Sequence, residues 1–150
     1  MTTTVTAKLR VLIVDDSRVM REMIARALAL SRLPVAHVDH AADGAAALTA
    51  VRAKAYDLVL LDLNMPVMDG EQFLATARAD PALRRLLVVV CSTESHPSRI
   101  RRLRLLGAEF VHKPFRPEEL NAAIARATGA VPGPDGDGDG GDGGNGTGAP

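Results

Sequence analysis

The sequence predicts an α/β domain in which a five-stranded parallel sheet is doubly wound, with helices on both faces. Five short segments rich in Val, Leu and Ile alternate with segments whose apolar residues recur at three-to-four spacing. These are the patterns of strands and of amphipathic helices. Regular alternation of the two is typical of parallel strands joined by right-handed crossovers, because each helix returns the chain to the same end of the sheet.

In the first half of the chain, residues 9–14 are an apolar strand candidate, and Ser17 is a natural cap for a helix that extends to about residue 30. Residues 35–39 alternate apolar and polar positions, which is typical of a strand at a sheet edge. A helix after Asp43 and a continuous apolar run at residues 58–61 follow. The apolar positions of the first helix are Val19, Met20, Met23, Ile24, Ala27 and Leu28.

The second half of the chain contains two further strand candidates, residues 87–91 and 110–112. Proline and glycine mark the helices around them, since proline fits the first turn of a helix and glycine often follows the last. On this basis the helices begin near Gly70, Pro97 and Pro117 and end before Pro81, at Gly107 and near residue 127. In the helix between Pro97 and Gly107, we expect Ile100, Leu103 and Leu106 to face inward.

A chain of 150 residues has room for one domain of ordinary size. We expect this domain to span residues 9–129, after a flexible lead of residues 1–8. Residues 130–150 are rich in glycine, aspartate and proline. Because such a composition cannot bury enough apolar surface to fold, we expect a disordered tail.

The single cysteine, Cys91, excludes an internal disulfide, and no segment resembles a signal peptide or a membrane span. We therefore expect a protein of the reducing cytoplasm with no membrane partner. One helix carries a group of largely outward-facing arginines, Arg99, Arg101, Arg102 and Arg104. They could form a nucleic-acid patch, a solvated face or a surface for an acidic effector. Nucleic acid is disfavoured, because the helix has no interleaved aromatic residues.

Polar side chains follow four of the predicted strands at the point where each strand ends. They are Asp15 and Asp16, Asp62, Ser92 and Lys113. Because the carboxyl ends of parallel strands lie at one edge of the sheet, and ligands bind there, we expect these four segments to meet in one pocket. Taken alone, the acidic turn at residues 15–16 could equally be a helix cap.

Three carboxylates brought together repel one another, so a positive group is expected among them. Mg²⁺ is the candidate, because it takes oxygen ligands and keeps several waters. A metal, the ammonium of Lys113 and the hydroxyl of Ser92 around one carboxylate could hold a phosphoryl group, whose phosphorus Asp62 would attack. We therefore predict an aspartyl phosphate on Asp62.

These motifs resemble the receiver domain of two-component response regulators, most closely the stand-alone receivers of chemotaxis, over about residues 9–127. The motifs are Val-Asp-Asp-Ser at residues 14–17, Asp-Leu-Asn-Met-Pro-Val-Met-Asp-Gly at residues 62–70, Ser92, and Lys-Pro-Phe at residues 113–115. The resemblance implies the flavodoxin-like (βα)5 fold with strand order 2-1-3-4-5.

The resemblance also implies a role for each matching residue. Asp62 would be the phosphoacceptor, and Lys113 and Ser92 would contact the phosphoryl oxygens. The implied Mg²⁺ ligands are the side chains of Asp16 and Asp62, the backbone carbonyl of Asn64 and, through water, Asp15. The peptide bond before Pro114 would be cis.

Three further positions concern the conformational change on phosphorylation and the lifetime of the phosphoryl group. In relatives, an aromatic side chain at the position of Phe110 swings inward when the Ser or Thr hydroxyl is drawn to the phosphoryl group. Phe110 lacks the hydroxyl of a tyrosine, so any such switch must rest on packing. Asn64 and Glu94 would flank the path of the hydrolytic water and set the phosphoryl lifetime.

The resemblance implies a signalling domain that is not an enzyme, apart from its own phosphorylation and dephosphorylation. Its partners would be a histidine kinase or histidine phosphotransfer protein, docking at Arg18, Arg21 and Glu22, and an effector that binds residues 97–127. One alternative is a phosphohydrolase of the haloacid-dehalogenase kind. Such enzymes usually carry a second aspartate where this chain has Asn64. The other alternative is a degenerate receiver that acts only as a binding module.

Overall fold

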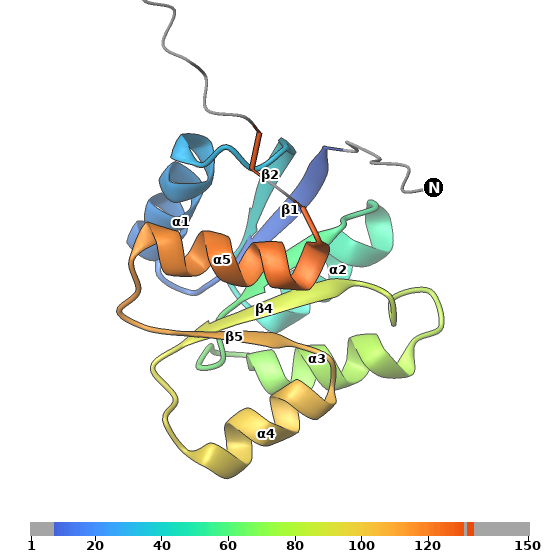
Figure 1. Cartoon of the computed structure of the whole chain (residues 1–150). Helices are drawn as coiled ribbons and strands as arrows, with labels where there is room; N and C mark the ends of the chain where they lie inside the picture. The colour runs from blue at the N-terminus through green and yellow to red at the C-terminus, as the bar shows by residue number, and fades with distance from the viewer. Residues whose placement is uncertain (1–7, 131, 134–150) are drawn as a thin grey trace, which may run out of the picture.

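The computed structural model describes residues 8–130, 132 and 133, and the predictions for the lead and for most of the tail lie outside them. The strands are β1 (Leu9–Val14), β2 (Val35–Ala41), β3 (Leu58–Leu61), β4 (Leu87–Ser92) and β5 (Glu109–His112). The helices are α1 (Arg18–Leu30), α2 (Gly44–Ala53), α3 (Gly70–Ala79), α4 (Pro97–Leu105) and α5 (Pro117–Thr128). Neighbouring strands are parallel in the order β2-β1-β3-β4-β5, which confirms the predicted doubly wound α/β fold (Figure 1).

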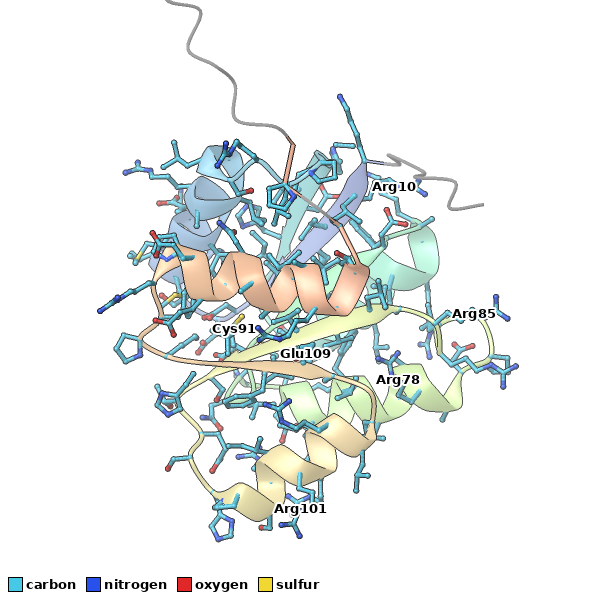
Figure 2. All side chains as sticks on the ribbon, viewed as in Figure 1. Arg10, Arg78, Arg85, Cys91, Arg101 and Glu109 are labelled. Atoms are coloured by element: carbon cyan, nitrogen blue, oxygen red, sulfur yellow. The ribbon has the colours of Figure 1, made fainter. Side chains whose placement is uncertain are left out.

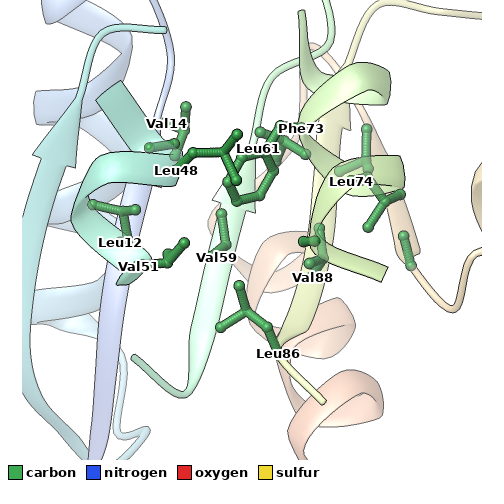
Figure 3. Close-up of a cluster of buried hydrophobic side chains, with 14 of the residues drawn as sticks. Leu12, Val14, Leu48, Val51, Val59, Leu61, Phe73, Leu74, Leu86 and Val88 are labelled. Atoms are coloured by element: carbon green, nitrogen blue, oxygen red, sulfur yellow. The ribbon is translucent and has the colours of Figure 1, made fainter. Parts of the chain in front are cut away.

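Helices cover both faces of the sheet. Side chains of α1 and α5 pack with one set of strand residues, and side chains of α2, α3 and α4 pack with the alternate set. On β3, for example, Leu58 and Leu60 point to the first face, whereas Val59 and Leu61 point to the second. Figure 3 shows the second face, where Val59 and Leu61 meet the ring of Phe73. Both faces of the central strands are therefore covered by helices, which explains why these strands are continuous runs of apolar residues.

Strand β2 lies at the edge of the sheet, as its alternating sequence predicts. It pairs with β1 alone, and among its residues only Ala41 is buried. The strand extends beyond the predicted residue 39, because its pairing with β1 continues to Val14 opposite Ala41.

The predicted apolar stripe of α1 is too wide. Ile24 and Leu28 are buried, but Val19 and Met23 keep 68% and 59% of their surface exposed. The stripe that reaches the sheet is formed by residues four positions apart, and positions 19 and 23 lie on its flank. With Leu30 at its end, which is 79% exposed, the helix therefore presents three large apolar side chains to the solvent.

Helix α4 is held by few buried side chains. Leu103 is its one buried residue, whereas Ile100 and, just after the helix, Leu106 are half-buried instead of fully inward. The guanidinium of Arg78 on α3 stabilises the end of α4, because its Nε donates a 2.6 Å hydrogen bond to the carbonyl of Leu106. Figure 2 shows Arg78 on α3, facing the rest of the molecule.

Two glycines fix the loop that follows β3. The amide of Gly70 donates to the carbonyl of Leu63 at 2.9 Å, and a Cβ atom at Gly70 would lie 2.1 Å from the carbonyl oxygen of Asp62. The amide of Gly44 on α2 donates to the carbonyl of Met68 at 2.9 Å, and a Cβ atom there would lie 2.6 Å from that oxygen. The close approach of α2 and α3 therefore holds the backbone around Asp62.

Among the described helices, none combines the length and the apolar character that crossing a membrane would require.

Candidate functional site

The predicted site residues meet at the carboxyl edge of the sheet. Asp15, Asp62 and Lys113 each follow a strand directly, and Ser92 is the last residue of β4. Backbone hydrogen bonds continue the sheet through these residues. The amide of Asp62 donates to the carbonyl of Val14 at 2.9 Å, and the amide of Lys113 donates to the carbonyl of Ser92 at 2.8 Å. The sheet itself therefore sets the spacing between these side chains.

Three carboxylates form an acidic cluster at this edge. One oxygen from each of Asp15, Asp16 and Asp62 lies within 4.8 Å of the others. Asp15 and Asp62 are 2% and 8% exposed, whereas Asp16 is open to solvent. Oxygen ligands with one open side suit a hard divalent cation that keeps part of its water shell. The cluster can therefore hold a metal ion.

Lys113 supplies the positive charge beside this cluster. Its Nζ lies 2.8 Å from Oδ2 of Asp15 and 3.4 Å from Oδ1 of Asp62. Burial raises the pKa of Asp62, the Lys113 charge works against that rise, and the Asp15 charge adds to it. Burial alone would lower the pKa of Lys113, but its hydrogen bond to Asp15 and the Asp62 charge outweigh it and raise that pKa. The lysine therefore remains charged.

Ser92 lies on β4, the strand that pairs with β3, and is fully buried. Its Oγ accepts a 3.1 Å hydrogen bond from the backbone amide of Glu94. A hydroxyl that accepts in this way keeps its own proton for donation. The hydroxyl proton of Ser92 is therefore available for a hydrogen bond to a further acceptor.

The other residues named by the resemblance surround this centre. Asn64 is exposed on the loop after β3, and Phe110 is half-buried against the core beneath α4. The peptide bond between Lys113 and Pro114 is cis, as the resemblance implies. The carboxylate of Glu94 is paired with an arginine, Arg99, at 2.8 Å.

Two arginines differ from their predicted places. Arg21, expected as an exposed docking contact, is half-buried, and its Nη1 donates a 2.6 Å hydrogen bond to the backbone carbonyl of Asp15. Arg99, expected to point largely outward, is 24% exposed and pairs with Glu94 and Glu71. Sequence periodicity could not show either contact, because each depends on how a long side chain folds back onto another element.

A doubly wound sheet whose carboxyl edge holds an acidic cluster and an ammonium is the arrangement expected of the receiver domains that the sequence resembles. Comparison with known proteins gives the family. The sequence profile of the response regulator receiver domain matches residues 11–125, so the chain belongs to this family. It is a receiver of two-component phosphorelay response regulators.

Its relatives include receivers of the chemotaxis type. The chain is 33% identical to a probable chemotaxis protein CheY of Rhizobium etli over 125 residues, which cover 83% of this chain and 95% of that protein. The high-resolution structure of the chemotaxis response regulator CheY4 of Vibrio cholerae is similar, with a TM-score of 0.72, 31% identity and coverage of 81% of this chain and 99% of that one. The phosphorylated cyanobacterial phytochrome response regulator RcpA matches with a TM-score of 0.67 and 32% identity, covering 79% of this chain and 89% of that one. The family match favours a receiver over the phosphohydrolase alternative.

Proposed function

We propose that Asp62 accepts a phosphoryl group from a phosphohistidine donor in a Mg²⁺-dependent reaction, and that the phosphorylated protein signals by binding an effector. The observation that carries this proposal is the meeting of three carboxylates within 4.8 Å beside the ammonium of Lys113, 3.4 Å from Asp62. The 32% identical relative RcpA is a response regulator whose structure is that of the phosphorylated protein, which supports the same chemistry here.

Each group has a separate part in this reaction. The side chains of Asp16 and Asp62 and the backbone carbonyl of Asn64 would hold Mg²⁺, with Asp15 acting through water. When bound, the cation neutralises the charge on the transferring phosphoryl oxygens. Lys113, whose ammonium lies 3.4 Å from Oδ1 of Asp62, would neutralise part of that charge as well.

In the transfer step, a carboxylate oxygen of Asp62 forms a bond to phosphorus while the bond from phosphorus to the donor histidine nitrogen breaks. The hydroxyl of Ser92, which already accepts from the Glu94 amide, donates its proton in a hydrogen bond to a phosphoryl oxygen. Positioning and charge neutralisation supply most of the catalysis in such transfers. This transfer step needs no further acid or base from the protein.

Incubation with acetyl phosphate and Mg²⁺, followed by intact mass measurement, tests the acceptor. Wild type is expected to gain one phosphoryl group and Asp62→Asn none. Asp57→Asn is the matched control, because Asp57 lies just before the same strand, at its opposite end, where it accepts from the Arg10 amide. Gain of the group by Asp62→Asn, or by wild type with Mg²⁺ chelated, would contradict the proposal.

We propose that the phosphate donor docks on α1, beside the acidic cluster. Arg18 and Glu22 are exposed and form an ion pair at 3.1 Å, and Val19 and Met23 add apolar surface next to them. Charge reversal at Arg18 is expected to slow transfer from a phosphorylated histidine phosphotransfer domain and to leave uptake from acetyl phosphate unchanged. Equal transfer rates would count against this docking surface.

We propose that the effector binds the surface formed by α4, β5 and α5. Leu105 on α4 is 81% exposed, and Arg101 points away from the body of the protein (Figure 2). An apolar side chain among arginines fits an effector segment that is acidic with an apolar anchor. Arg101→Glu is expected to weaken effector binding without changing phosphoryl uptake. This function goes with the cytoplasmic location that the sequence predicts.

A further inference from the structure

The carboxylate of Glu94 is fully engaged by its surroundings. Its Oε1 accepts a 3.0 Å hydrogen bond from the backbone amide of His96, and its Oε2 accepts one of 2.8 Å from Nη1 of Arg99. The pKa of Glu94 is lowered by the His96 amide and by Arg99. The side chain is therefore an anion whose two oxygens are both directed at donors of its own loop and helix.

Arg99 is itself fixed from a third element. Its Nε donates to Oε2 of Glu71, in the first turn of α3, at 3.2 Å. Oε1 of Glu71 accepts a second bond, of 3.0 Å, from Nε of Arg102. Burial opposes the charge of Arg99, but its hydrogen bonds to Glu94 and Glu71 outweigh burial and raise its pKa. We call Glu71, Glu94 and Arg99 the α3–α4 ion-pair cluster.

This cluster adjoins the phosphorylation site through one short link. The backbone amide of Glu94 donates to Oγ of Ser92 at 3.1 Å, and Ser92 is the proposed hydroxyl contact of the phosphoryl group. Glu94 therefore lies two residues after Ser92 in the chain, but its carboxylate is directed toward Arg99. A glutamate at this place could otherwise turn toward a water molecule that approaches the phosphoryl group.

We propose that Arg99 is a positioning residue that holds the Glu94 carboxylate away from the attacking water and so prolongs the life of the aspartyl phosphate. The inference rests on the proposed phosphorylation of Asp62. In hydrolysis, the water oxygen forms a bond to phosphorus, the bond from phosphorus to the Asp62 oxygen breaks, and Asp62 returns as a carboxylate. The proton of the water passes to the Glu94 carboxylate once Arg99 no longer holds it, and then to solvent.

The expected size of the effect follows from the chemistry of the step. A well-placed general base contributes on the order of 10² to 10⁴ in rate. Phosphoryl transfer passes through a loose transition state in which the attacking water is little deprotonated, so less is expected here. Removal of Arg99 should shorten the phosphoryl lifetime on the order of tenfold, below the general-base range.

The test follows decay of the phosphorylated protein by intact mass after acetyl phosphate is removed, with Mg²⁺ present. Arg99→Met is expected to lose the group on the order of tenfold faster than wild type, and Arg99→Lys to stay near the wild-type rate because an ammonium can still pair with Glu94. Arg85→Met is the control, since Arg85 is an exposed arginine in the loop before β4 (Figure 2). Glu71→Gln, which removes the charge that anchors Arg99 and leaves Glu94 intact, is expected to act in the same direction more weakly.

A double variant separates positioning from general loosening of the fold. Arg99→Met combined with Glu94→Gln is expected to decay no faster than Glu94→Gln alone, because the base is gone. Added salt is expected to speed decay in wild type and not in Arg99→Met, since salt screens the pair that the variant lacks. Normal uptake with an unchanged lifetime in Arg99→Met, or fast decay that persists in the double variant, overturns this inference alone. Absence of uptake in wild type overturns the proposed function as well.

Discussion

Lys113 and Asp15, 98 residues apart in sequence, form a 2.8 Å ion pair across the carboxyl edge of the sheet. The side chain of Asp15 is 3% exposed and that of Lys113 is 12% exposed, so water screens the pair weakly. Oδ1 of Asp15 accepts a further hydrogen bond from the amide of Ser17 at 2.8 Å. The ammonium thus compensates a buried carboxylate in addition to facing Asp62, the phosphoacceptor that we propose.

Replacement of Lys113 by methionine is expected to destabilise the protein in the absence of metal. Loss of one partner from a buried pair typically costs about 3–5 kcal/mol, because the other charge stays buried without compensation. Urea unfolding at neutral pH measures the difference, with Lys8→Met as the control at an exposed lysine. The deficit should shrink in acid, where Asp62, whose pKa burial raises, takes up a proton. Equal stability of both variants would show that Lys113 has no such role.

Tyr56 is the only tyrosine of the chain, and its hydroxyl donates a hydrogen bond to Asp39 on β2. Burial and this hydrogen bond raise the pKa of Tyr56 to about 12. The folded protein therefore holds the phenol proton more tightly than the unfolded chain does, and this stabilisation is lost as pH rises from 10.0 through about 12.

Ultraviolet titration of the phenol checks this expectation. Wild type should ionise near 12, and Asp39→Asn should shift the midpoint toward the ordinary tyrosine pKa of 10.0. The Tyr56 hydrogen bond in turn lowers the pKa of Asp39 to about 2. The contribution of Asp39 to stability should accordingly be lost as pH falls from 3.8 toward 2. A wild-type midpoint near that of a free phenol would contradict the contact.

Gly70→Ala is expected to lower the free energy of unfolding by about 3 kcal/mol, since the new Cβ atom forces a backbone shift. That atom would lie 2.1 Å from the carbonyl oxygen of Asp62 and 3.0 Å from Cα of Leu63. Gly107→Ala is the comparison, because its Cβ atom would meet nothing closer than 3.7 Å and only its left-handed φ of 79° opposes the change. Chemical denaturation of both should rank Gly70→Ala as the more damaging, and the opposite order would contradict the packing argument.

Val67 is a β-branched residue with a φ of 68°, which L residues other than glycine, asparagine and aspartate rarely adopt. It occupies the centre of a γ-turn, because the amide of Met68 donates to the carbonyl of Pro66 at 2.8 Å. Its side chain is 83% exposed and contributes little to packing. Val67→Asn is therefore expected to raise the free energy of unfolding by about 1 kcal/mol, measured by thermal or urea unfolding. A loss of stability would show that the valine is not strained.

The sequence predicted the sheet and the position of its edge strand β2 because both depend on patterns of apolar residues. It also predicted that the side chains of Asp15, Asp16, Asp62 and Lys113 lie close together, since strand ends in a parallel sheet lie at one edge whatever the detailed packing. The order of the strands came from family resemblance, because local periodicity carries no information about which strands are neighbours.

The sequence did not predict side-chain contacts that depend on how the helices and strands pack in the folded structure. Val19 and Met23 fit the apolar period of α1 but lie beside the surface that meets the sheet. Arg21 and Arg99 looked like solvated charges, yet each folds back onto a neighbouring element. The sequence also did not predict that residue 70 must be glycine. The requirement comes from the close approach of the Asp62 backbone and not from a turn.

The single buried side chain of α4, Leu103, has a consequence for how such proteins diversify. Its exposed positions, such as Arg101 and Leu105, can change at little cost to the hydrophobic core. Evolution can therefore change the outer surface of the helix, where we propose that the effector binds, while the side chains at the carboxyl edge of the sheet stay the same.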